Sequence, residues 1–445
     1  MANLERGLAT VGSQFERPVR RAKFFLGNHT GERLAWGEAR DLLHQLDECV
    51  LEEKDPIAKK ARSLIRENTL AIGNSVCFRL SAYHRDTFLR DLFLVRQFAD
   101  APLMDKMGLD MFADAQDKKT GQMPTSIFAF GKEGFRFPDE STLYYPIFAW
   151  QAEVENGVEL SPKHIEAVRR AVGYITRRLD SNGFLYNDPV LHEDDRRTYW
   201  ADELMLPEAD VVAFKQGLAA VALRAAFSLG ITEDLYSAAF AEKGYRRLAE
   251  QYDGRLPLSL KTGWRDVSAL YPEYLSIVLF NQKMLDDAVV KNTIASFATR
   301  TPEDTEIPDV GFRVILDEEG GYIPEDRFIA VTFPQEFMDT PGRYQNGGTW
   351  LIWDHAAWVV GRLHGIDDFR FLPQHVRNVF NGNYIKGLVF GFEMPEYLYT
   401  GRFYGERFDD PSRTGQTWDA TIMDQRRRME KYVRDTITPG SRNSL

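Results

Sequence analysis

Apolar residues recur along most of the chain at spacings of three and four, the pattern of amphipathic helices. Many of these segments begin at a helix-capping residue, as at Ser161 before Pro162. The pattern predicts helices over Leu34–Glu53, Ile57–Glu67, Thr87–Ala99, Leu103–Ala115, Thr142–Glu155, Pro162–Leu179, Ala209–Leu229, Thr232–Gln251, Tyr271–Phe280, Met284–Phe297, Thr349–His364 and Thr414–Thr436. We therefore expect an all-α protein.

Strand patterns are weak by comparison. Apolar residues alternate in Gly311–Leu316 and Phe328–Phe333, which predicts at most a short β-hairpin near residues 310–335. No Gly-, Ser- or Pro-rich linker divides the chain. We expect one domain over residues 1–445, with residues 1–20 as a flexible or peripheral segment.

Long segments rich in aromatic, acidic and glycine residues separate some of the predicted helices. They are residues 116–141, 181–207, 300–348 and 383–413. Loops of this length in a compact domain are more often functional than idle. Helix pairs joined by alternating short and long loops can close into a six-hairpin ring, the (α/α)6 toroid, with the long loops at one mouth. The periodicity also fits an irregular helical domain, whereas a repeat array would need a fixed period that we do not find.

Charge and composition exclude several classes of function. The net charge is −11, and an acidic chain repels the phosphate backbone of nucleic acids. Two cysteines, Cys49 and Cys77, cannot form a disulfide framework or a thiolate zinc site. The sequence has no apolar run typical of a signal peptide or a membrane span, so we expect a cytoplasmic protein without a membrane partner. Nucleotide-binding and metal-binding motifs are also absent, and we expect no cofactor.

The remaining candidates for chemistry are carboxylates, amides and aromatic rings in the long segments. Acids and amides bind sugar hydroxyls, rings stack on sugar faces, and two carboxyl groups can cleave a glycosidic bond. Asp202 is notable because it follows Tyr199 and Trp200 and precedes the apolar Leu204. A carboxyl group held against rings is desolvated, which raises its pKa and lets it act as a general acid. Simpler roles stay open: Asp86 and Asp139 could cap helices, and the tryptophans could be helix core.

Several short motifs, in this order, resemble the amylo-α-1,6-glucosidase part of glycogen-debranching enzymes and related six-hairpin glycosidases. They are Arg85-Asp86-Thr87, the Gly121–Pro124 loop with the Asp139–Thr142 helix start, Thr198–Asp202, the Tyr344-x-x-Gly347-x-x-Trp350 spacing, Glu396, and Gln416-Thr417-Trp418. Thr198–Asp202 departs from the family's Thr-Trp-Met-Asp by one inserted residue and by alanine in place of methionine.

This resemblance implies an (α/α)6 toroid that hydrolyses an α-glucoside or similar sugar with inversion and needs no cofactor. Asp202 would be the general acid and Glu396 the general base, with Glu393 as the alternative base. The substrate-binding residues would be Arg85, Asp86, Asp139, Trp200, Tyr344, Gln345, Trp350, Gln416 and Trp418. The expected partner is a small oligosaccharide or glycoside.

Other functions fit the same scaffold. A sugar phosphorylase, an unsaturated-uronide hydrolase or a sugar epimerase would also use acids and rings at the mouth of a toroid. A helical carbohydrate-binding protein without activity would explain the helices, but it does not account for the acidic aromatic segments.

Overall fold

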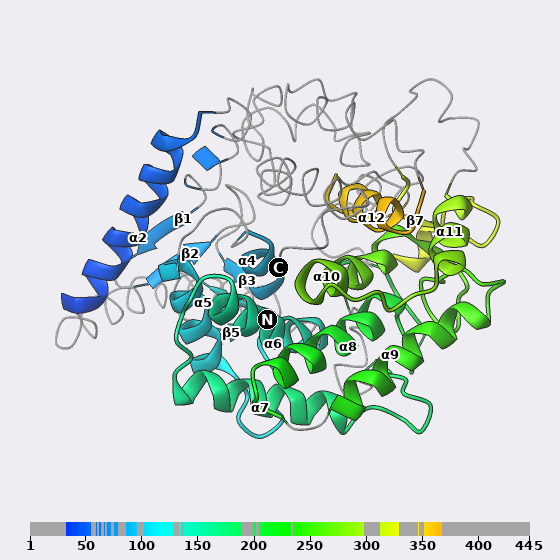
Figure 1. Cartoon of the computed structure of the whole chain (residues 1–445), viewed down its shortest axis with the longest axis horizontal. Helices are drawn as coiled ribbons and strands as arrows, with labels where there is room; N and C mark the ends of the chain where they lie inside the picture. The colour runs from blue at the N-terminus through cyan, green and yellow to red at the C-terminus, as the bar shows by residue number, and fades with distance from the viewer. Residues whose placement is uncertain are drawn as a thin grey trace, which may run out of the picture.

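The structure is a computed structural model of the chain, and helices dominate the part that it describes (Figure 1). The described residues are 33–54, 59, 62–63, 66, 69–72, 75–78, 86–95, 102–128, 133–134, 138–187, 199–201, 204–207, 209–232, 235–297, 312–328, 346 and 351–366.

Consecutive inner helices form the centre of the described part. They are α4 (Leu89–Val95), α6 (Pro138–Val154), α8 (Ala213–Ser228), α10 (Tyr271–Phe280) and α12 (Leu351–Leu363). Each packs against the next one in this series. In α8, 14 of 16 residues are buried, and they include alanines and leucines on all sides. A helix that is apolar all round is enclosed on all sides, which explains its central place.

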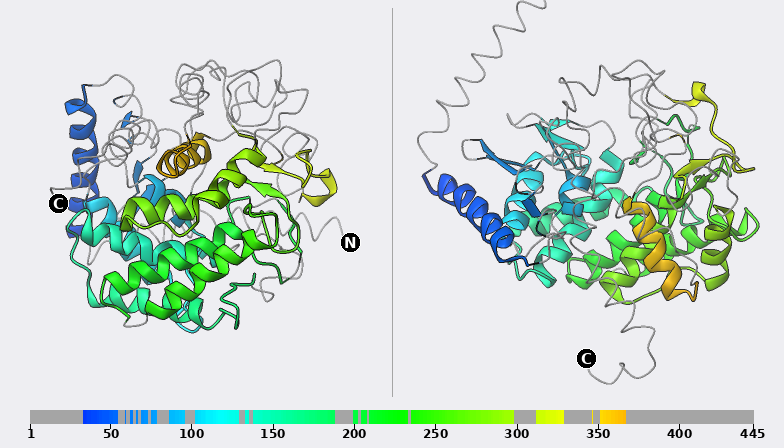
Figure 2. Two further views of the ribbon diagram at one scale, coloured as in Figure 1. Left: turned by 45° about the vertical axis from the view of Figure 1, so that its right-hand side comes forward. Right: turned by 90° about the horizontal axis from the view of Figure 1, so that it is seen from above.

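Outer helices alternate with the inner ones along the chain. They are α5 (Pro102–Ala115), α7 (Pro162–Thr176), α9 (Leu235–Glu250) and α11 (Asp287–Ser296). α7 packs on α6 and α8, and α9 packs on α8. The buried residues of α7, such as Ala167, Ala171 and Tyr174, recur at helical spacing, so only one face points inward. α2 (Arg33–Glu52) packs on α5 and lies at the edge in both views of Figure 2.

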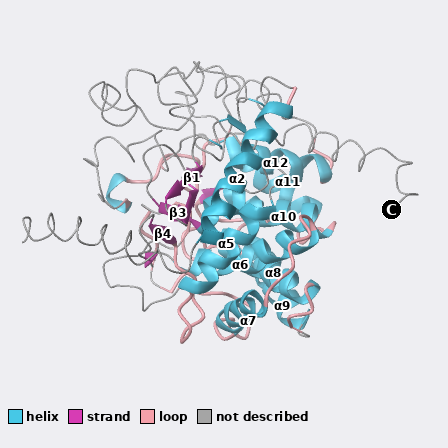
Figure 3. Cartoon of the chain, turned by 90° about the vertical axis from the view of Figure 1, so that its left-hand side faces the viewer, coloured by secondary structure: helices cyan, strands magenta, loops and turns pink. Residues whose placement is uncertain are grey.

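Short antiparallel strands accompany the helices. β1 (Thr69–Ile72) pairs with β2 (Ser75–Phe78), and β4 (Ser126–Phe128) pairs with both β3 (Asp86–Phe88) and β5 (Glu133–Gly134). Figure 3 shows β1, β3 and β4 together on one side of the helices. β6 (Arg265–Asp266) pairs with β7 (Ile315–Leu316), and β6 leads into the 3-10 helix η2 (Val267–Leu270) before α10. A second 3-10 helix, η4, spans Glu325–Arg327.

The connections between helices alternate in length. Short turns, residues 155–161, 229–234 and 281–286, join α6 to α7, α8 to α9 and α10 to α11. Longer segments lead from each outer helix to the next inner helix, as residues 177–212 do between α7 and α8. Helices joined by short turns run antiparallel, so the inner helices begin at the end where the long segments lie. We call this end the mouth.

The structure corrects three local predictions. Residues 86–88 form β3, and the helix predicted from Thr87 starts at Leu89, so Asp86 does not cap it. α6 begins at Pro138, four residues before the predicted Thr142, and Asp139 lies inside its first turn. Ile315–Leu316 pair with β6, while Phe328 forms a bridge with Leu204, so these described residues do not form the expected hairpin. The helix predicted over Thr414–Thr436 lies outside the described residues.

A single apolar core runs between the inner helices. Its largest buried side chains include Trp353, Tyr144, Tyr271 and Phe214, all in the first two turns of inner helices. Within the described residues, every helix is too short or too polar to cross a membrane.

Candidate active site

Buried charged and aromatic side chains gather at the mouth, where the inner helices begin. Asp139 and Glu140 lie in the first turn of α6, Arg90 and Asp91 in that of α4, and Lys215 in that of α8. All five side chains are buried. Burying so many charges is costly unless they are paired. The contacts of these side chains therefore decide which of them can take part in chemistry.

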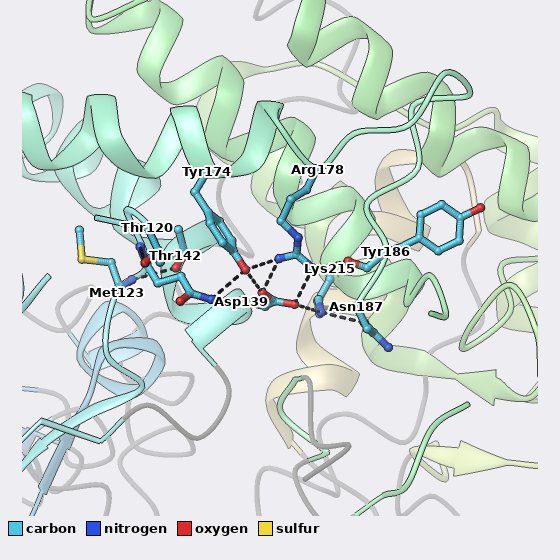
Figure 4. Close-up of polar contacts among 10 residues, drawn as sticks. Thr120, Met123, Asp139, Thr142, Tyr174, Arg178, Tyr186, Asn187 and Lys215 are labelled. Carbon is cyan, nitrogen blue, oxygen red and sulfur yellow. Dashed lines mark hydrogen bonds and ion pairs between the residues drawn. The ribbon is translucent and has the colours of Figure 1, made fainter. Parts of the chain in front are cut away.

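Asp139 is the centre of a polar network that joins α6, α7 and α8 (Figure 4). Its Oδ2 accepts a hydrogen bond from Lys215 Nζ at 2.7 Å and one from Arg178 Nη2 at 3.3 Å. Its Oδ1 accepts from Arg178 Nη1 at 2.5 Å and from the hydroxyl of Tyr174. Lys215 Nζ also donates to Asn187 Oδ1 at 2.8 Å. The carboxylate therefore has a donor at each of about four lone-pair positions.

The charges within this network determine how Asp139 titrates. Burial alone would raise its pKa, but the positive charges of Lys215 and Arg178 reverse the effect and hold the pKa well below its usual value. Burial lowers the pKa of the Lys215 ammonium, and the charge of Asp139 opposes that shift. The carboxylate of Asp139 is thus ionised at neutral pH and cannot serve as a proton donor.

The Asp139 network also holds the loop that precedes α6. The backbone N–H of Met123 donates to Thr142 Oγ1 at 2.9 Å, and Gln122 Nε2 donates to the hydroxyl of Tyr174 at 3.0 Å. The structure thereby brings together the Gly121–Pro124 loop and the start of α6, two segments that the sequence motifs paired.

A second ion pair lies on the α4 side of the mouth. Arg90 Nη1 lies 3.1 Å from Glu140 Oε2, and Arg90 Nε lies 3.4 Å from Asp91 Oδ1. Both carboxyl groups and the guanidinium are buried. This pair joins α4 to α6 as Lys215 joins α8 to α6.

Aromatic rings fill the centre of the mouth. The ring of Trp353 lies 5.1 Å from that of Trp200, 5.4 Å from that of Tyr271 and 5.8 Å from that of Phe214. The buried hydroxyls of Tyr144 and Tyr271 have no hydrogen-bond partner among the residues that the structure describes. Burial raises the pKa of both phenols well above the usual value, so they stay neutral and can donate.

Another buried carboxyl group lies behind Trp200. Asp266 Oδ2 accepts from the Tyr199 hydroxyl at 3.1 Å and from Ser268 Oγ at 2.7 Å. The Trp200 indole N–H in turn donates to Ser268 Oγ at 2.6 Å. Burial raises the pKa of Asp266 to about 7, although the hydrogen bonds from Ser268 and Tyr199 act in the opposite direction.

Two of the predicted site residues, Asp139 and Trp200, have described side chains, and both are buried at the mouth. Asp86 is described through its backbone, which pairs with Phe128. The others lie outside the described residues: Arg85, Asp202, Tyr344, Gln345, Trp350, Glu393, Glu396, Gln416 and Trp418.

Sequence reasoning missed Lys215, Arg178, Glu140, Tyr271 and Asp266. Lys215 gave one usable signal, because it is a lone charge near the start of the apolar run AFKQGLAAVAL. A charge in an enclosed helix needs a buried partner.

No protein-family profile and no curated protein sequence matches the chain. Several solved structures do share its fold. A glycosidase variant in complex with glucose is 16% identical over 88% of this chain and 97% of its own, with a TM-score of 0.51. The wild-type glycosidase is 16% identical over 89% and 99%, with a TM-score of 0.50. A GH63 mannosylglycerate hydrolase from Thermus thermophilus, also in complex with glucose, is 11% identical over 83% and 99%, with a TM-score of 0.50.

Proposed function

We propose that this protein is a glycoside hydrolase that cleaves an α-glucoside or a similar α-linked sugar with inversion, on a closed (α/α)6 toroid. The observation that carries this proposal is the mouth itself. Its buried phenols, Tyr144 and Tyr271, have hydroxyl groups without a hydrogen-bond partner among the described residues, and the ring of Tyr271 lies against that of Trp353, which in turn contacts Trp200. Aromatic rings and neutral hydroxyl donors are the groups that a sugar-binding site requires.

The likeness in fold to glycosidases supports the same reaction class, because two of those structures hold glucose. Their sequence identity to this chain is too low for the roles of individual residues to be transferred. The roles proposed here therefore rest on this sequence. The name of one of them, a mannosylglycerate hydrolase, adds glycosyl-glycerates to the candidate substrates.

Asp202 is the proposed general acid and Glu396 the proposed general base. Asp202 would protonate the leaving oxygen, and Glu396 would take a proton from a water on the opposite face of the sugar. Inversion requires the two carboxyl groups to lie roughly 6.5–9.5 Å apart, so that the water fits between them. Glu393 is three residues away from Glu396 and is the alternative base.

The remaining predicted contacts divide into two groups. Arg85, Asp86, Tyr344, Gln345 and Gln416 are proposed to bind hydroxyls, while Trp200, Trp350 and Trp418 are proposed to form the walls of the pocket. Asp139 already accepts from Lys215, Arg178 and Tyr174, and a sugar hydroxyl would have to displace one of these donors. We therefore propose that Asp139 supports the site through its neighbours.

A screen of α-linked disaccharides and glycosyl-glycerates, with the released anomer followed by NMR, tests the function. We expect a β-anomer as the first product, because inversion changes the configuration at the reacting carbon. Asp202→Asn and Glu396→Gln should each lower kcat by at least about a thousandfold. Glu393→Gln is the matched control for the base and should keep most of the activity. Release of an α-anomer, or full activity in Asp202→Asn, would reject the mechanism.

A further inference from the structure

The segment that leads to Asp202 is fastened at two adjacent rings. Tyr199 and Trp200 are both buried, and both are linked to the same short stretch at the start of η2. The Tyr199 hydroxyl donates to Asp266 Oδ2 at 3.1 Å, and the Trp200 indole donates to Ser268 Oγ at 2.6 Å. Ser268 Oγ in turn donates to Asp266 Oδ2 at 2.7 Å, so Trp200 and Asp266 are joined through Ser268.

We propose that Asp266 and Ser268 are positioning residues that hold the Tyr199–Trp200 segment, and with it the carboxyl group of Asp202, in its working place. This inference rests on the proposed function for the role of Asp202, but the anchoring of the segment can be tested separately.

The anchor is itself fixed by the backbone around it. Asp266 is the residue before η2, and its Oδ1 accepts from the backbone N–H of Ser268 at 2.9 Å. The backbone of Asp266 pairs with Ile315 in the ladder of β6 and β7. The side chains of Asp266 and Ser268 are both buried. A side chain with so many contacts has little freedom, so it can serve as a fixed point.

The rings on the other side of the anchor are also packed. Trp200 lies against Trp353 of α12 at 5.1 Å between ring centroids, and Tyr199 lies against Phe214 of α8 at 5.8 Å. Asp202 follows Trp200 by two positions, a reach of at most about 7 Å between their Cα atoms. A shift of about 1 Å in a catalytic group can cost a hundredfold in rate, so an anchor at this distance matters for catalysis.

Two matched substitutions at Ser268 test the proposal. Ser268→Ala removes the hydroxyl that accepts from the Trp200 indole and donates to Asp266, whereas Ser268→Thr keeps it. We expect Ser268→Ala to lower kcat about tenfold on the substrate found in the screen while KM stays within about threefold, and Ser268→Thr to recover most of kcat. Asp266→Asn should lower kcat further, since its amide nitrogen cannot accept the donors from Tyr199 and Ser268.

Hydrogen exchange provides a readout that does not depend on activity. Peptides that contain residues 199–207 should exchange at least about tenfold faster in Ser268→Ala than in the wild type or in Ser268→Thr. Ser276→Ala is the control, because Ser276 is a buried serine farther along α10 that contacts Arg224 instead. It should change neither the exchange of this segment nor kcat.

The outcomes separate the two proposals. Unchanged exchange in Ser268→Ala would overturn the anchor, and so would faster exchange with an unchanged kcat. If Asp202→Asn keeps full activity, the proposed function fails even where the exchange result holds. If Asp266→Asn does not fold, Ser268→Ala and Tyr199→Phe still decide the question, because each removes one hydroxyl of the anchor, and Ser268→Thr remains the control that keeps it.

Discussion

Lys215 Nζ on α8 lies 2.7 Å from Asp139 Oδ2 on α6, and neither side chain reaches solvent. The two residues are 76 positions apart in the sequence, so the pair joins helices from different hairpins. Each buried charge depends on the other, because without Asp139 the Lys215 ammonium would keep only Asn187 among the described residues, and without Lys215 the carboxylate would lose one of its positive partners.

Removing either partner of this pair should destabilise the protein strongly. We expect Lys215→Met and Asp139→Asn each to lower the free energy of unfolding by about 3–5 kcal/mol. The double variant should lose clearly less than the sum of the two losses. Urea unfolding of all four proteins measures the coupling. Lys283→Met, which breaks an exposed pair with Asp287, is the control and should cost less than about 1 kcal/mol. Losses that add up within about 0.5 kcal/mol would show that the pair is not coupled.

Asp110 should make stability depend on pH in the acid range. Its hydrogen bond with His164, at 2.9 Å, and its contact with Lys163 lower its pKa to about 2. A carboxyl group with a lowered pKa stabilises the fold above its unfolded value near 4, and this contribution is lost as pH falls towards 2. The wild type should exceed Asp110→Asn by about 1 kcal/mol at pH 6, a modest value because Asp110 is partly exposed.

Unfolding at a series of pH values from 6 to 2 checks this prediction. The difference between the two proteins should shrink as the pH approaches 2. Asp114→Asn is the control, since Asp114 contacts Lys163 from a more exposed position. A difference that stays constant over this range would mean that Asp110 acts through packing and not through its charge.

Gly244 should not tolerate a side chain. A Cβ at this position would lie 2.3 Å from the carbonyl oxygen of Gly183 and 2.8 Å from Gln216 Nε2. Gly244→Ala should therefore cost about 1–3 kcal/mol or more, because the loop before Asn187 must move away from α9. Gly173→Ala on α7 is the contrast, since its Cβ would meet only the flexible end of Arg177 at 3.1 Å. It should raise stability by up to about 1 kcal/mol. Thermal unfolding of both variants should give shifts of opposite sign.

The phenol of Tyr271 should matter for binding and not for folding. Its hydroxyl is buried and has no partner among the described residues, so Tyr271→Phe removes an unsatisfied group. We expect unchanged or slightly raised stability, with an affinity for glucose or the cleaved sugar that falls about tenfold. Tyr245→Phe is the control of opposite sign, because the hydroxyl of Tyr245 donates to the carbonyl oxygen of Ala269 and its loss should lower stability. Calorimetric titration and thermal unfolding together separate the two effects.

The helices could be predicted where local signals agree. Residues 271–280 form α10 with the predicted bounds, because Pro272 favours a helix start and Asn281 ends the helix in the left-handed conformation. Ser161 caps α7 as expected, and its hydroxyl accepts from the backbone N–H of His164. β3 was missed because its three residues are a strand only through pairing with β4, forty residues further on. Pairing between distant segments leaves little trace in a local pattern.

The same distinction holds for the site. Asp139 and Trp200 were proposed from short motifs, and both lie at the mouth. Lys215 and Asp266 were missed because their importance lies in partners that are 76 and 67 residues away. Whether Asp202 and Glu396 face each other stays a prediction from sequence.

The short turns on the face opposite the mouth offer a practical handle. Gly157 and Gly230 lie in two of these turns with φ of 65° and 68°, so the glycines themselves should be kept, although a Cβ at either position would meet no atom within 4 Å. An affinity tag or a surface-attachment cysteine placed in residues 155–161 or 229–234 would orient an immobilised molecule with its long loops towards the solution. The scaffold therefore suits display on a sensor chip, with the mouth facing the solution.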